Sequence, residues 1–180
     1  MRTKPQDDDH VGFSGWRLLG LGFWQAWWMI SMCTDVLLPT TDRFPFAGNT
    51  TLWVLVLTTV GYLVVVALAR RLSPFLTHRA SFLAAGGLTA AGTVTLPIAL
   101  TLGSGAAGFA WFLAGTVSLS LGNALLLIMW GELWSALATG RVGRHLYVSY
   151  TFAFVLFFVA YALPEAAAVA FTAALPIVSA

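Results

Sequence analysis

Five apolar stretches, each about twenty residues long, run through this 180-residue chain, and positive charge falls on every second loop between them. A helix rises about 1.5 Å per residue, so about twenty apolar residues cross the roughly 30 Å hydrocarbon core of a bilayer. Hydrophobic residues make up 59% of the sequence and charged residues only 9%, too few to cover a water-soluble surface. The pattern predicts an all-α, polytopic transmembrane helical bundle.

The sequence predicts a cytoplasmic tail over residues 1–15 and a transmembrane domain over residues 16–180. Five full spans are expected at about 16–38, 51–69, 80–101, 107–137 and 146–163, with a partial sixth at 166–180. Fifteen residues reach only about 22 Å, short of a crossing. We therefore expect the chain to be a fragment of a longer protein, with a re-entrant half-helix as the alternative.

Basic residues set the expected orientation, because short cytoplasmic loops are enriched in Lys and Arg. One side of the membrane receives Arg43 alone, and the other receives Arg2, Lys4, Arg17, Arg70, Arg71, Arg79, Arg141 and Arg144. We expect a multi-pass protein of the bacterial inner membrane with its N-terminus in the cytoplasm. The first apolar run is too long for a cleavable signal peptide, so it should remain as the first span.

Tryptophans divide into two sets. Five lie near expected span ends, where indole rings favour the headgroup region: Trp16, Trp53, Trp111, Trp130 and Trp134. Trp24, Trp27 and Trp28 instead lie near the middle of the first span, and their spacing places them on one side of a helix. We expect either a bulky packing ridge or lipid-facing surface, or an aromatic wall of a ligand cavity with Gln25 on the neighbouring face.

Polar side chains at membrane depth are the other candidate ligand contacts, because an unpaired polar group in hydrocarbon is costly. Thr116, Ser120 and Asn123 share one face of the expected fourth span, and Thr58 and Tyr62 form a similar pair in the second. Hydroxyls can bond their own helix backbone. Asn123 has two donors and an acceptor to satisfy, so it predicts either an interhelical clamp or part of a cavity.

Small residues are concentrated in the third and fourth spans, where they favour close helix packing, with glycine hinges for rocking motions as the alternative. They are Gly86, Gly87, Ala90, Ala91, Gly92, Gly108, Gly115 and Gly122. Cys33, the one cysteine, has no disulfide partner in the chain and is expected to be a small core residue.

Charged residues near the membrane suggest one structural contact. Glu132 lies near the cytoplasmic end of the fourth span, and Arg141 and Arg144 follow it. We expect a cytoplasmic ion pair among them, with a movable gate latch as the alternative. Asp35 should reach the outer interface, where a proton or cation role is the less favoured interpretation.

Motifs for chemistry are missing from the sequence. It contains no phosphate-binding glycine loop, no HExxH and no serine elbow, and its histidines have no metal-ligand spacing. We expect no enzymatic activity, no metal and no cofactor.

Two families share short motifs with this chain. Gly131-Glu132-Leu133, followed by Gly140-Arg141-Val142-Gly143-Arg144, is similar to the helix-four to helix-five region of major facilitator transporters. That resemblance implies one six-helix half whose inner end is locked by Glu132 with Arg141 and Arg144. The loop at 70–74 lacks the Gly-x-x-x-Asp signature of that superfamily, which counts against ion-driven transport.

More closely, the chain resembles the N-terminal membrane domain of LuxR-type regulators of Coriobacteria-like actinobacteria. The resemblance rests on the Trp-rich segment at 22–27, the block at 129–133, Leu163-Pro164 and the last six residues. It implies a transporter-like bundle of about twelve helices followed by a helix-turn-helix DNA-binding domain, which these residues do not contain.

Two functions of different class follow. The first is a sensory membrane domain of a one-component regulator, in which a small molecule bound between helices rearranges the bundle. The second is the N-terminal half of a major-facilitator-like secondary transporter. Both would use Trp24, Gln25, Trp27, Trp28, Tyr62 and Asn123 as ligand contacts. The expected partners are lipid, a small-molecule ligand, and either the remaining helices with the DNA-binding domain or a second copy; this segment should not contact nucleic acid.

Overall fold

The computed structural model describes residues 15–34, 36, 50–72, 79–103, 105–135 and 139–180. These residues form six helices: α1 (Gly15–Cys33), α2 (Thr50–Leu72), α3 (Arg79–Thr101), α4 (Ala106–Ser135), α5 (Thr139–Ala162) and α6 (Glu165–Ser179). The all-helical expectation is confirmed. Each expected span corresponds to one helix, and the largest difference is at α5, which begins seven residues before the expected span at 146.

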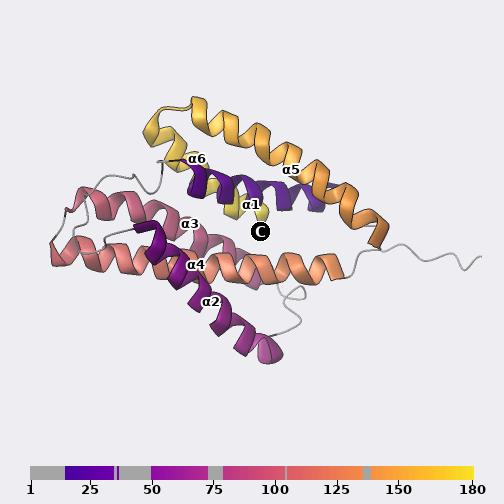
Figure 1. The fold of residues 1–180 in the computed structure, drawn as a ribbon, viewed down its shortest axis with the longest axis horizontal. Helices are drawn as coiled ribbons and strands as arrows, with labels where there is room; N and C mark the ends of the chain where they lie inside the picture. The colour runs from indigo at the N-terminus through magenta and orange to yellow at the C-terminus, as the bar shows by residue number, and fades with distance from the viewer. Residues whose placement is uncertain (1–14, 35, 37–49, 73–78, 104, 136–138) are drawn as a thin grey trace, which may run out of the picture.

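The helices pack as two groups of three (Figure 1). In the first group α1 packs against both α5 and α6, and in the second α4 packs against both α2 and α3. Contacts between α3 and α6 join the two groups. Neighbours in sequence are therefore often not neighbours in space.

The most extensive helix contacts have an internal symmetry that relates the first three helices to the last three. If each helix is exchanged with the one three positions away in the chain, α1 with α5 becomes α4 with α2, and α3 with α4 becomes α6 with α1. The pair of α3 with α6 maps onto itself. The set of principal contacts is thus unchanged when α1–α3 and α4–α6 are interchanged.

Glycines let α3 and α4 approach to backbone contact. A Cβ atom added at Gly92 would lie 2.6 Å from the carbonyl oxygen of Gly115 and 2.6 Å from the backbone nitrogen of Leu119. One added at Gly122 would lie 2.7 Å from the carbonyl oxygen of Ala85. The close packing expected from the small residues of these two helices is confirmed at Gly92, Gly115 and Gly122.

Three helical segments are long and apolar enough to cross a membrane: Ala80–Thr101, Ala106–Ser135 and Val142–Ala162. Shorter apolar segments lie at Leu52–Leu68 and Glu165–Ser179. Large apolar side chains cover the outward faces of α2 and α5, where Leu63 is 65% and Phe158 also 65% exposed. Such a surface is suited to lipid or to further protein and not to water, which agrees with a membrane location. Among the described residues, three of the five expected full spans meet the length and apolar character of a crossing.

Two residues differ from their expected environments. Cys33 is exposed at the last position of α1, because the core side of that helix is taken by larger side chains such as Trp27 and Ile30. Trp130 is buried among the helices instead of lying at the interface. Its ring packs over Gly20 of α1, whose missing side chain leaves room for it.

Candidate functional site

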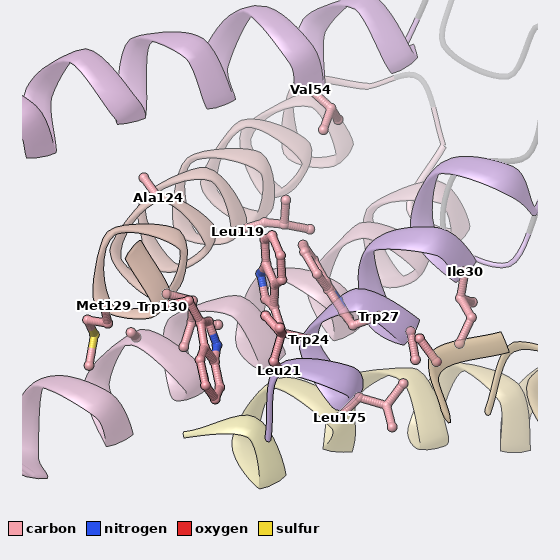
Figure 2. Close-up of a cluster of buried hydrophobic side chains, with 14 of the residues drawn as sticks. Leu21, Trp24, Trp27, Ile30, Val54, Leu119, Ala124, Met129, Trp130 and Leu175 are labelled. Atoms are coloured by element: carbon pink, nitrogen blue, oxygen red, sulfur yellow. The ribbon is translucent and has the colours of Figure 1, made fainter. Parts of the chain in front are cut away.

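Two of the three tryptophans at the centre of α1 lie in the core (Figure 2). Trp27 is fully buried and Trp24 nearly so, while Trp28 is half-buried and packs its ring against that of Trp27 with centroids 6.2 Å apart. The packing ridge expected from their spacing is therefore observed for Trp24 and Trp27. The indole N–H group of each of these two residues donates a hydrogen bond to a residue of the second helix group.

A chain of side-chain hydrogen bonds joins three helices around Asn123. The indole Nε1 of Trp24 donates to Oδ1 of Asn123 over 2.9 Å, and Nδ2 of Asn123 donates to the hydroxyl of Tyr62 over 3.0 Å. Asn123 has no exposed surface. The chain therefore connects α1, α4 and α2 through residues that the sequence had grouped only as separate candidates.

The direction of this chain follows from elementary chemistry. An indole N–H can only donate, so the Asn123 amide must turn its oxygen toward Trp24 and its nitrogen toward Tyr62. The Tyr62 oxygen must then accept, which leaves its own proton for another partner. The orientation of the Asn123 amide, usually ambiguous, is fixed here by its neighbour.

Further hydrogen bonds lie on either side of the Asn123 chain. Trp27 donates its indole N–H to the hydroxyl of Thr93 over 2.9 Å, and Thr93 in turn donates to the carbonyl of Thr89 over 2.8 Å. Between α2 and α4, the hydroxyls of Thr58 and Ser120 are 3.2 Å apart. The polar face expected on α4 thus contacts the polar face of α2 at two places, Ser120 with Thr58 and Asn123 with Tyr62. Thr93 on α3 was not identified from the sequence.

Gln25 is buried, with 3% of its surface exposed, and its Oε1 has no hydrogen-bond partner among the described residues. The structure does not join Gln25 or Trp28 to the Asn123 chain by a side-chain hydrogen bond in the part that it describes. Two other buried polar atoms share this condition, Nε1 of Trp130 and Oγ of Ser179. An unsatisfied buried acceptor is unfavourable, so the Gln25 oxygen does not stabilise the fold.

We expect Gln25→Met to leave the free energy of unfolding unchanged or to raise it by up to about 1 kcal/mol, because the change keeps the length of the side chain and removes the unpaired amide oxygen. The measurement is equilibrium unfolding of the purified protein by SDS in mixed micelles. If Gln25→Met lowers the free energy of unfolding by more than about 1 kcal/mol, the Gln25 amide has a bound partner, such as a buried water.

The residues of the expected ion pair lie at the end of α4 and the start of α5, and the pairing itself stays a prediction. Glu132 is half-buried on the last turn of α4, and Arg144 is exposed. Both arginines lie within α5 and not in a loop, since that helix begins at Thr139. The side chain of Arg141 and the whole of Asp35 are outside the described residues, so the roles of Arg141 and Asp35 remain predictions.

The described residues contain no cluster of three His, Cys, Asp or Glu side chains placed to hold a metal ion. The central group of polar residues is uncharged and consists of indole, amide, phenol and hydroxyl groups. Such groups can bind and orient a ligand and can hold helices together. Comparison of the chain with protein-family models, curated proteins and solved structures gives no match.

Proposed function

We propose that the chain is the ligand-binding membrane domain of a one-component transcriptional regulator of the LuxR type. A small molecule binds at Trp24, Asn123 and Tyr62, and its binding changes how the two helix groups pack. A helix-turn-helix domain outside these 180 residues would respond to that change.

The observation that carries this proposal is the polar connection between the two helix groups. Trp24 bonds to Asn123 on α4, and Trp27 bonds to Thr93 on α3, so α1 is attached to the other group by two indole N–H groups. Hydrogen bonds between membrane helices contribute about 0.6 kcal/mol on average, with the largest near 1.7 kcal/mol. A ligand that changes the strength of one of them can therefore shift the equilibrium between two packings.

The helix arrangement supports a major-facilitator-like six-helix half. Such halves consist of two three-helix repeats of opposite orientation. The principal contacts here are preserved when α1–α3 and α4–α6 are interchanged, and three crossings by α1–α3 would invert the second repeat relative to the first. In this proposal all of α1 to α5 cross the inner membrane, and the N-terminus lies in the cytoplasm.

A second candidate function is the N-terminal half of a secondary transporter, which the same exchange of helices favours. The side chains of the hydrogen-bonded core carry no charge, whereas coupling ions and protons are usually handled by acidic or basic residues in the membrane. For that reason we prefer the sensor to the transporter. The coding sequence beyond residue 180 separates the two: a helix-turn-helix domain after further spans supports the sensor, and further spans alone support the transporter.

The ligand site is tested by titrating the purified protein, in lipid nanodiscs, with a defined library of small metabolites and following tryptophan fluorescence. We expect compounds that quench the parent protein to bind Asn123→Ala at least about tenfold more weakly, equivalent to about 1.4 kcal/mol. The control is Trp111→Phe, because Trp111 is 49% exposed on α4 and should not affect binding.

Retention of a single size-exclusion peak shows that Asn123→Ala remains folded. If every compound that binds the parent binds this folded variant equally well, the site is not at Asn123. If no compound binds the parent, the sensory function is abandoned for this domain.

A further inference from the structure

From the direction of the hydrogen bonds around Asn123, we propose that the site takes a neutral, largely apolar molecule whose carbonyl or ether oxygen accepts a hydrogen bond from Tyr62. The inference rests on the proposed ligand-binding function and adds the chemical class of the ligand.

The Tyr62 hydroxyl proton is not used in the hydrogen bond to Asn123. The Tyr62 oxygen accepts from Nδ2 of Asn123 over 3.0 Å, because the Asn123 oxygen is engaged by the indole of Trp24. The hydroxyl proton must then point to a different acceptor. Among the residues that the structure describes, no acceptor for this proton is found, in contrast to the hydroxyls of Thr58, Thr93 and Thr116, which all have partners.

A ligand can approach only one end of this chain of hydrogen bonds. Asn123 and Trp27 have no exposed surface, and Trp24 has 9%, so a ligand cannot reach the inner end of the chain without moving helices. Tyr62 is only partly buried, at the edge where α2 packs on α4. The chain of hydrogen bonds therefore begins in the closed core at Trp24 and ends at a residue that keeps some exposed surface.

The side chains one helical turn from Tyr62 and Asn123 are uncharged. One helical turn on either side of Tyr62, α2 carries Thr58, Thr59, Val65 and Val66, and around Asn123, α4 carries Leu119, Ser120, Leu126 and Leu127. None of these side chains has a charge that could neutralise a carboxylate or phosphate, and an unpaired ion in this environment is strongly unfavourable. The acceptor must be neutral, and the rest of the ligand must suit an apolar surface.

Binding at Tyr62 would also be felt at Trp24. When a hydroxyl donates to a ligand, its oxygen becomes a better acceptor, and hydrogen bonds in series strengthen one another. An acceptor at Tyr62 should therefore strengthen the bond from Asn123 and then the bond from Trp24. This links an accessible contact on α2 to the connection between the helix groups.

The test uses the indole ¹H–¹⁵N resonances of the protein in nanodiscs, with Trp24 assigned from Trp24→Phe. The probes are 2-nonanone, which has one carbonyl, and nonane, which has the same chain and none. We expect 2-nonanone to shift the Trp24 resonance downfield and saturably, nonane to leave it in place, and Tyr62→Phe to weaken the response at least fivefold. Tyr161→Phe is the matched control, because Tyr161 is 77% exposed on α5, and Trp111 reports probe dissolved in the lipid.

The comparison of the two probes on the unmodified protein needs no variant, so it decides even if Tyr62→Phe folds poorly. Equal shifts with both probes, or an undiminished ketone response in folded Tyr62→Phe, overturn the acceptor site but leave ligand binding near Trp24 in place. A Trp24 resonance that neither probe moves also overturns it. The sensory function itself fails only if the library titration finds no ligand of any class.

Discussion

Trp27→Ala should lower the free energy of unfolding by about 3–5 kcal/mol, the range found when a large buried aromatic side chain is removed. Trp27 has no exposed surface and packs in the central cluster with Trp24 and Ile30 (Figure 2). Its loss leaves a cavity that the surrounding helices cannot fill by side-chain movement alone. The measurement is SDS unfolding in mixed micelles, followed by far-ultraviolet circular dichroism.

The control for this change is Trp111→Ala, which removes the same side chain from a position that is 49% exposed and should alter the free energy of unfolding by less than about 1 kcal/mol. Trp27→Phe should fall between them, because it keeps most of the ring volume and removes the hydrogen bond to Thr93. Equal losses for Trp27→Ala and Trp111→Ala would contradict the central position of Trp27.

The length and apolar character of the segments were sufficient to locate the helices, because an apolar run of about twenty residues can satisfy all its backbone hydrogen bonds within a bilayer by forming a helix. The start of α5 was not located, since its first turns contain Gly140, Arg141, Gly143 and Arg144, which are typical of a loop. A helix can continue past the apolar region when its backbone remains hydrogen-bonded, and hydropathy does not report this.

The candidate site was partly predictable. Helical spacing placed Trp24 with Trp27, and the three hydrogen-bonding groups of Asn123 required partners in hydrocarbon. The partners themselves could not be deduced: Trp24 is 99 residues from Asn123, and Tyr62 is 61 residues from it. Which faces meet depends on the packing of the whole bundle, and for the same reason the burial of Trp130 and the exposure of Cys33 were missed.

Thr93 shows a different limit of sequence reasoning. A threonine in a membrane helix usually bonds its own backbone, and Thr93 does so with the carbonyl of Thr89. That bond uses its donor but leaves its oxygen able to accept from Trp27. Nothing in the local sequence distinguishes it from Thr95, which makes the same type of backbone bond at a more exposed position.

Gly92→Ala should lower the free energy of unfolding by about 3 kcal/mol, the upper part of the usual range for overpacking. The new methyl group would lie 2.6 Å from the carbonyl oxygen of Gly115 and from both Cβ and the backbone nitrogen of Leu119. Backbone atoms cannot rotate away as the end of a flexible side chain can, so α3 and α4 must separate. We expect Gly122→Ala to have a comparable effect, because its methyl group would meet the backbone of Ala85 and Thr89.

Gly87→Ala is the matched control, since Gly87 lies on the same helix, is exposed, and has no atom within 4 Å of an added Cβ. Alanine is favoured over glycine in a helix by up to about 1 kcal/mol, so this variant should be as stable as the parent or slightly more so. The pair Gly92→Ala and Gly87→Ala separates steric contact from helix propensity, because the chemical change is identical. If both variants unfold at the same SDS fraction as the parent, α3 and α4 are not in backbone contact in the membrane.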